Sequence, residues 1–250
     1  ELMSISAHKF FKKEGEASSN MGDEEFIDLV KKGIKHCMRG DVFQIVLSRR
    51  FSQAYSGDDF SLYRVLRSIN PSPYIFYFDF GGFKIFGSSP EAQLVVQDGL
   101  AEIHPIAGTF IRTGNDIQDE ARAKELAKDL KENAEHMMLV DLARNDLSRH
   151  GYEVSVEKDR EVQFYSHVIH LVSKVTAQKK TDTATMQIVA DTFPAGTLSG
   201  APKHRAMQLI ESYETTDRSF YGGAIGFLDF KGNYNHAIII RSFFYNFSFL

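Results

Sequence analysis

The stretch Phe193-Pro-Ala-Gly-Thr-Leu-Ser-Gly-Ala-Pro-Lys203 is a turn-rich loop that the pattern predicts to run directly into an amphipathic helix over 200–213. Thr197 and Ser199 are hydroxyl residues suited to an N-cap, and Pro202 suits the first helical turn. A helix start with free N–H groups beside basic side chains is a natural anion site. The same residues also fit an ordinary junction between a loop and a helix, so the neighbouring segments must decide between the two.

The composition is that of an ordinary globular protein, with 250 residues, 43% hydrophobic and 25% charged residues, and a net charge of −4. This charge does not favour binding to nucleic acid or to an anionic membrane, and the apolar runs are too short to span a bilayer. Cys37 is the single cysteine, so we expect no internal disulfide, no zinc cluster and a reducing, cytoplasmic location. No signal peptide is visible at the start, and because the first residue is Glu1 rather than Met we expect a fragment of a longer protein.

The first 50 residues predict a helix and a strand after a polar, flexible lead-in over 1–22. We expect Asp23 to cap a helix over about 24–38, and Arg39-Gly40-Asp41 to end it. Its buried face would carry Phe26, Leu29, Val30, Ile34 and Met38. A strand over 42–49 follows, in which Gln44 lies among apolar residues. That amide could belong to a site, or it could be a hydrogen-bonded group of the core or of a sheet edge.

A run of strands is predicted after a short helix over 61–69. The candidates are 74–80, 83–88 and 92–97, and tight Gly-containing turns make them an antiparallel meander, followed by a strand over 100–106. Glu91 lies at the junction where Pro90 interrupts the ladder.

Residues 119–147 carry the clearest helical pattern, with apolar residues at intervals of four: Leu126, Leu130, Ala134 and Met138. Glu132 and Glu135 are three residues apart and therefore neighbours on this helix. Such carboxylates could hold a hard cation such as Mg2+, or they could form a solvated charged face.

The last 100 residues predict strands over 152–156 and 167–175, a helix over 182–192, and a hairpin that starts at Tyr221 and turns at Lys231-Gly232. His170 lies among apolar residues of its strand and could be a hydrogen-bonded core histidine or a functional one. Arg241 is expected near the end of the returning strand, over 236–242.

Several long motifs in this order resemble those of the chorismate-utilising enzymes, over about residues 23–242. The motifs are Asp41–Arg49, Ser89-Pro-Glu91, Pro105-Ile-Ala-Gly-Thr109, Glu135–Asp146, His170-Leu171, Phe193–Pro202 and Tyr221–Gly226. Within the family they are most similar to component I of the anthranilate synthases. Aminodeoxychorismate synthases typically carry Lys where this chain has Ala107. Isochorismate and salicylate synthases typically carry Lys where this chain has Gln44, and that Lys activates a water nucleophile. Glutamine cannot act as a general base, so attack by water is disfavoured here.

The resemblance implies an Mg2+-dependent lyase that converts chorismate and ammonia to anthranilate and pyruvate in tryptophan biosynthesis. Glu91 matches the general acid, His170 matches the histidine of the pyruvate-elimination step, and Gln44 favours ammonia over water. Glu135 and Glu132 match the metal site. The positions that match substrate-binding residues are Gly108, Thr109, Thr197, Tyr221 and Arg241. The implied partners are chorismate, a glutamine amidotransferase subunit that delivers ammonia, and tryptophan as feedback inhibitor of the full-length protein.

The family fold implied is α+β: a two-lobed sandwich of antiparallel sheets with outer helices, here truncated, with a chorismate-binding domain over 23–250. Compared with complete family members, the N-terminal regulatory part and a C-terminal segment with further carboxylates are missing. We therefore expect the fragment alone to show little or no turnover. Aminodeoxychorismate synthase and an inactive chorismate-binding fragment remain as alternatives.

Overall fold

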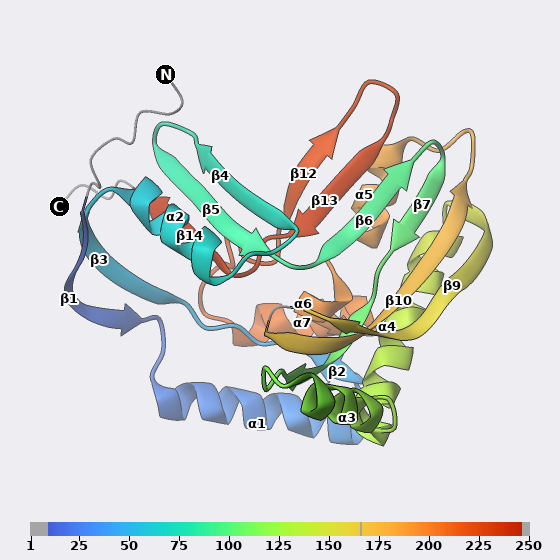
Figure 1. Cartoon of the computed structure of the whole chain (residues 1–250), viewed down its shortest axis with the longest axis horizontal. Coiled ribbons are helices and arrows are strands. Elements are labelled where there is room, and N and C mark those ends of the chain that lie inside the picture. Colours follow the sequence, from blue (N-terminus) through green and yellow to red (C-terminus); the bar gives the residue numbers. More distant parts are fainter. Residues whose placement is uncertain (1–9, 166, 247–250) are drawn as a thin grey trace. The chain divides into compact units, whose positions relative to one another are not determined.

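Helices alternate with antiparallel strands throughout residues 10–165 and 167–246, which the computed structural model describes (Figure 1). This mixture confirms the predicted α+β class. The chain divides into two compact units. Unit 1 draws on residues 1–90, 202–223 and 239–250, and unit 2 on residues 91–201 and 224–238. Among the described helices, none is long and apolar enough to cross a membrane.

Unit 2 is built on a seven-stranded antiparallel sheet, ordered β12-β13-β6-β7-β10-β8, with β9 paired to β10. Its strands are β6 (Ala92–Gln97), β7 (Leu100–Ile103), β8 (Ile106–Ile111), β9 (Gly151–Phe164), β10 (Val168–Lys179), β12 (Ala224–Leu228) and β13 (Tyr234–Ile238). β9 pairs along most of β10. Because a strand has only two edges, β7 and β8 share the other one, β8 beside the first half of β10 and β7 beside the second.

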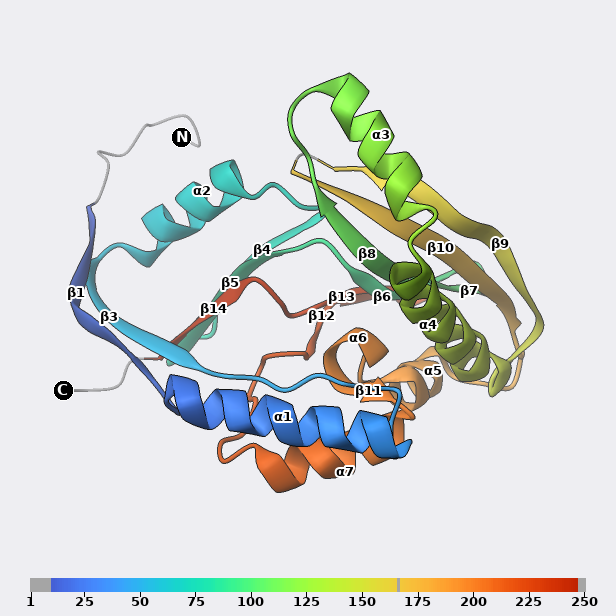
Figure 2. The same cartoon turned by 90° about the horizontal axis from the view of Figure 1, so that it is seen from below.

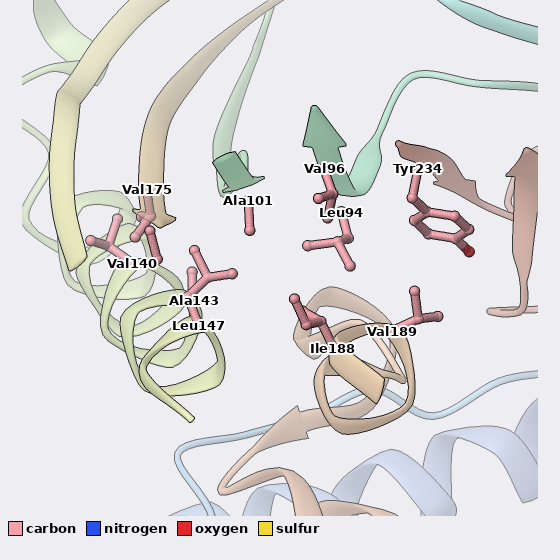
Figure 3. Close-up of a cluster of buried hydrophobic side chains, with 11 residues drawn as sticks. Leu94, Val96, Ala101, Val140, Ala143, Leu147, Val175, Ile188, Val189 and Tyr234 are labelled. Carbon is pink, nitrogen blue, oxygen red and sulfur yellow. The ribbon is translucent and has the colours of Figure 1, made fainter. Parts of the chain in front are cut away.

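The main core of unit 2 lies between this sheet and two helices, α4 (Leu130–Ser148) and α5 (Thr185–Thr192). Figure 3 shows side chains of the sheet meeting those of both helices. The cluster comprises Leu94, Val96, Ala101, Val140, Ala143, Leu147, Val175, Ala177, Ile188, Val189 and Tyr234. Burial of each large aliphatic side chain contributes roughly 1.5–3 kcal/mol, so α4 is firmly fixed to the sheet.

The predicted single helix over 119–147 is wrong, because the segment forms α3 (Asp116–Leu126) and a separate α4. The side chain of Asp129 accepts a hydrogen bond from the Glu132 N–H, and so caps a new helix. Leu126 is buried in a second cluster with Ala123, Ile169 and Leu171, whereas Leu130 is 88% exposed. The apolar residues at intervals of four therefore do not form one face. Figure 2 shows α3 and α4 as distinct helices beside β8 and β10.

Unit 1 combines a three-stranded sheet, a two-stranded ribbon and three longer helices. The sheet has the order β14-β5-β4, and β1 pairs with β3. The elements are β1 (Phe11–Ser19), α1 (Asp23–Arg39), β2 (Gln44–Ile45), β3 (Phe51–Gly57), α2 (Asp59–Ile69), β4 (Tyr74–Asp79), β5 (Phe83–Ser89), α7 (Lys203–Tyr213) and β14 (Ser242–Asn246). Helices α1 and α7 lie side by side (Figure 2), and buried Val42, Ala206 and Leu209 pack there with Cys37 and Tyr213.

The interruption predicted at Pro90 is confirmed, and it is a change of sheet. β4 pairs with β5 and β6 pairs with β7, but β5 and β6 belong to different sheets. The change of sheet falls at Pro90, which lacks the N–H that a ladder requires. Glu91 is therefore the residue at which the chain leaves one sheet and enters the other.

The buried face of α1 also differs from the prediction. Leu29, Gly33 and His36 are buried, whereas Ile34 is 52% exposed and Met38 is 83% exposed. The N-cap residue is Gly22, without a side-chain hydrogen bond, so Asp23 is not the cap. The helix ends as predicted, at Gly40 with φ 79°.

Two further predictions change at the start of the chain. The strand expected over 42–49 is reduced to the two residues of β2, and the following residues up to β3 have no regular structure. Part of the lead-in predicted over 1–22 forms β1, while residues 1–9 lie outside the described residues. The domain boundaries stay a prediction.

Candidate active site

A β-bulge between β8 and β10 places three of the predicted site residues together. Thr109 faces His170 across the ladder, but the next pair is Ala107 with Leu171, so Gly108 is the extra residue. Its φ of 75° suits glycine. The Nδ1 of His170 lies 3.0 Å from the Gly108 carbonyl oxygen and 3.1 Å from the Thr109 Oγ1. Since a carbonyl only accepts, Nδ1 carries a proton, so Nε2 is the nitrogen that accepts whenever the ring is neutral.

Glu132 reaches the same bulge from α4. A Cβ atom placed on Gly108 would lie 3.4 Å from Oε2 of Glu132 and 3.0 Å from Cδ1 of Leu126. The carboxylate is therefore packed over the glycine, and its side chain is 20% exposed. The absence of a side chain at position 108 thus allows a carboxylate, a hydroxyl and an imidazole to gather around one backbone position.

Glu135 is half-buried one turn further along α4. Its neighbour His136 is fully buried, and the His136 Nε2 lies 2.6 Å from the Oγ of Ser173 on β10. Burial lowers the pKa of His136. Helix α4 is therefore fixed to β10 by a neutral hydrogen-bonded pair as well as by the apolar core, and this fixes where Glu132 and Glu135 project.

The two glutamates fit Mg2+ as a partial set of ligands. Within residues 10–165 and 167–246, no group of three or more His, Cys, Asp or Glu side chains is arranged to hold a metal ion. Mg2+, however, is usually held by one or two carboxylates, with waters and substrate oxygens completing its octahedron. Glu132 and Glu135 offer hard oxygen donors of this kind and number.

Glu91 and Thr197 form the second group of predicted site residues. The Thr197 Oγ1 donates a hydrogen bond of 2.9 Å to Oε1 of Glu91, and the Glu91 carbonyl accepts one from the Ile238 N–H. Both side chains line a small recess of unit 2 with a cavity volume of about 40 Å³, enough for water molecules. The recess is also lined by Gln93, His104, Pro105, Leu139, Leu142, Asp146, Thr192 and Gly196, among others.

The loop over 193–203 therefore lines this recess, but its hydroxyl residues do not cap helix α7. Thr197 lies in the short helix α6 (Gly196–Ser199), which is followed by β11 (Gly200–Ala201). The Ser199 hydroxyl donates to the Ala195 carbonyl, and the cap residue of α7 is Pro202, without a side-chain hydrogen bond. The N-cap predicted at Thr197 or Ser199 is wrong, because both hydroxyls bond within unit 2 instead.

The remaining predicted site residues belong to unit 1. Gln44 is half-buried in β2. Tyr221 follows α7 in a turn, is 41% exposed, and has its pKa raised by burial. Arg241 lies in a bend between β13 and β14 with φ 50°, and its carbonyl accepts the Ser88 N–H. The strand predicted over 236–242 is therefore interrupted before Arg241.

The structure thus brings the predicted residues together in two groups within unit 2. Gly108, Thr109, Glu132 and His170 form the bulge group, and Glu91 with Thr197 forms the recess group. Glu135 shares α4 with Glu132.

Sequence reasoning missed a buried polar chain behind the recess. The His236 Nε2 lies 2.9 Å from Oε1 of Gln93, and Nε2 of Gln93 donates to the Thr192 carbonyl. All three residues are buried. The sequence does contain an indication of this chain, because Gln93 is a polar residue in an otherwise apolar strand. Gln44 was chosen as a candidate for the same reason.

Comparison with known proteins identifies one family. A family described as chorismate binding enzyme matches residues 4–248. The anthranilate synthase component 1 of Aquifex aeolicus is 46% identical over 226 residues, which cover 90% of this chain and 46% of the relative. A solved anthranilate synthase component I from Streptococcus pneumoniae has a TM-score of 0.86 and 40% identity, over 93% of this chain and 52% of that chain.

An isochorismate synthase, DhbC from Bacillus anthracis, is also similar in structure. Its TM-score is 0.81 and its identity 26%, over 95% of this chain and 65% of that chain. The chain spans about half the length of the curated relatives that it matches. The matches support one family, within which more than one reaction occurs.

Proposed function

Because the chain belongs to the family of chorismate binding enzymes, we propose that it provides catalytic and binding groups for converting chorismate and ammonia to anthranilate and pyruvate. Ammonia adds at C2 of the ring while the C4 hydroxyl leaves as water. The C2 proton and the enolpyruvyl group are then lost, and the enolpyruvyl group is released as pyruvate. The ring becomes aromatic in this second step.

The hydrogen bond between Thr197 and Glu91 is the observation that carries this proposal. A departing hydroxyl needs a proton, and a carboxylic acid held in place by a hydrogen bond can supply it. The threonine hydroxyl engages Oε1, at 2.9 Å. It thereby orients the carboxyl group that would donate the proton.

His170 is suited to the second step. Its Nδ1–H is directed to the Gly108 carbonyl, at 3.0 Å, so the neutral ring accepts protons at Nε2. A base of this kind can remove the C2 proton as the bond to the enolpyruvyl oxygen breaks. The Thr109 hydroxyl, 3.1 Å from Nδ1, helps to fix the plane of the ring.

Glu132 and Glu135 would hold Mg2+, which supplies positive charge to balance the ring carboxylate of chorismate. Packing against Gly108 and the N-cap at Asp129 fix Glu132 in the first turn of α4. Through the resemblance, Gln44, Tyr221 and Arg241 match further catalytic and substrate-binding positions. Arg241 is chemically suited to a carboxylate through its planar fork of donors, and Gln44 offers no base to activate water.

The ammonia would come from a glutamine amidotransferase partner, as the resemblance to the anthranilate synthases implies. Inhibition of the longer protein by tryptophan stays a prediction. Aminodeoxychorismate synthase and isochorismate synthase are the competing activities. Ala107, which is buried in β8, lacks the amine that the former typically carries at this position.

Product identity tests the proposal. The chain spans about half the length of its curated relatives, so the assay uses two proteins. One is the chain itself, and the other is a chimera in which it replaces the matching 226 residues of the Aquifex aeolicus protein. Each is incubated with chorismate, ammonium and Mg2+, and products are separated by chromatography. We expect anthranilate from the chimera and little turnover by the chain alone. A folded chimera that forms isochorismate or aminodeoxychorismate instead would contradict the proposal.

A further inference from the structure

The segment that follows Gln44 is held by side chains instead of by a sheet. Beyond β2, residues 46–48 have no regular structure. The Ser48 N–H donates a hydrogen bond of 2.7 Å to Oε1 of Glu214, and the Val46 carbonyl accepts one of 2.6 Å from Nη2 of Arg218. Two residues more than 160 positions away thus satisfy the backbone of this segment.

Those two residues also form a paired fork. Nε of Arg218 donates to Oε2 of Glu214 at 2.8 Å, and Nη2 donates to Oε1 at 2.6 Å. The two side chains are only 19% and 7% exposed, respectively. A bidentate pair of this kind has a single preferred geometry, so whatever is bonded to it is fixed in direction as well as in distance.

The same guanidinium contacts the turn that carries Tyr221. The Arg218 Cζ lies 5.8 Å from the centroid of the Tyr221 ring, within the range of a cation–π contact. The Tyr221 N–H also donates to the Arg218 carbonyl, at 3.0 Å. Arg218 is therefore joined on one side to the Gln44 segment and on the other to Tyr221.

We propose that Glu214 and Arg218 are positioning residues, a clasp that sets Gln44 and Tyr221 in one geometry for substrate binding. The residues to be positioned come from distant parts of the sequence, and this ion pair bonds the backbone just after β2 and contacts the turn of Tyr221. All residues of the clasp belong to unit 1. The roles of Gln44 and Tyr221 rest on the proposed function.

The test compares Arg218→Lys with Arg144→Lys, a matched control in an exposed helical ion pair with Asp141. Lysine keeps the charge but cannot make the fork. We expect Arg218→Lys to reduce amide exchange protection at Ser48 by about tenfold, the effect of losing a charged hydrogen bond. In the chimera we expect the KM for chorismate to rise about tenfold and kcat to change by less than about threefold, because ground-state contacts are misplaced. Arg144→Lys should change neither quantity.

A second variant, Glu214→Gln, keeps the shape of the acid and decides the matter if Arg218→Lys does not fold. It should show the same two effects at smaller size. Unchanged exchange at Ser48, or altered exchange with a wild-type KM, would overturn the clasp as a positioning device. A wild-type chimera without chorismate turnover would instead refute the proposed function, and exchange at Ser48 would then decide the clasp alone.

Discussion

Units 1 and 2 hold their candidate site residues in different ways. In unit 2, His170 and Thr109 are register partners in a ladder, and Gly108 is the bulge between them. In unit 1, Gln44 lies in a two-residue strand, and the segment after it is bonded to the side chains of Glu214 and Arg218. Main-chain pairing places the first set, whereas side-chain hydrogen bonds hold the segment that follows Gln44.

This difference determines how each set responds to change. A ladder distributes its hydrogen bonds over many residues, so a single side chain can be replaced without moving the strand. A segment held by one ion pair depends on that pair, and removing one partner leaves a buried charge uncompensated. Substitutions in unit 2 should therefore alter chemistry or local packing, whereas substitution of the clasp should move several residues at once.

The largest expected effect is on chemistry in unit 2. Glu91→Gln keeps an oxygen that can accept the hydrogen bond of the Thr197 hydroxyl, but it has no carboxyl proton to donate. We expect the chimera's kcat to fall about 100- to 10,000-fold, the range for loss of a general acid, while its melting temperature stays near wild type. A rate within about threefold of wild type would exclude Glu91 as the acid.

The next effect is on packing at the bulge. Gly108→Ala adds a Cβ at φ 75°, 3.0 Å from Leu126 and 3.4 Å from Glu132. Gly99→Ala is the matched control, since its φ is 86° but no atom lies within 4 Å of the added Cβ. The control should lose about 1 kcal/mol and Gly108→Ala about 2–3 kcal/mol of unfolding free energy in urea. Equal losses would mean that the bulge is not closely packed.

The free energy of unfolding should depend on pH, to a similar or smaller extent, through the buried hydrogen bonds of His236, Gln93 and Thr192 in unit 2. Burial lowers the pKa of His236 from 6.5 to about 4. The unfolded state therefore takes up this proton first, so the stabilisation is complete above about pH 6.5 and is lost as the pH falls towards 4. The loss is up to about 3 kcal/mol.

Urea unfolding between pH 7.5 and 4.5 measures this loss, with His236→Gln as the control. The variant should have a shallower pH dependence than wild type. His136, whose pKa burial also lowers, contributes with the same sign in both proteins. Identical slopes for wild type and variant would contradict the assignment to His236.

The smallest expected effect concerns the orientation of the acid. Thr197→Val removes a hydrogen bond to Glu91 and should lower the chimera's kcat about three- to tenfold, corresponding to about 0.5–1.5 kcal/mol. Thr197→Ser keeps the hydroxyl and should restore most of the rate. If serine were no better than valine, the methyl group of Thr197 and not its hydroxyl would matter.

The same contrast explains what the sequence could predict. Periodicity and Gly-containing turns predicted β4, β5 and β6 to within one residue, but β7 ends at Ile103, three residues before the predicted end. Pro90 indicated the break in the ladder but not that β5 and β6 belong to different sheets, since pairing partners are set by tertiary contacts. The helix over 119–147 was also misjudged, because the N-cap at Asp129 outweighed an apolar spacing that spans the break.

The candidate site was predicted through motifs, and the structure explains part of it. Thr109, His170 and Gly108 meet because of the register between β8 and β10, and the order of motifs along the sequence does not specify that register. The bond from Thr197 to Glu91 joins residues 106 positions apart, and no local pattern specifies it. Glu214 and Arg218 were not singled out, because their role lies in backbone groups of a distant segment.

Isotope labelling of the product tests the central claim most directly. The chimera is incubated with chorismate, Mg2+ and 15N-ammonium, and the products are analysed by mass spectrometry. The proposed function predicts anthranilate carrying one 15N atom, with formation nearly abolished by Glu91→Gln. Isochorismate without 15N, or labelled anthranilate formed at an undiminished rate by the Glu91→Gln chimera, would contradict it.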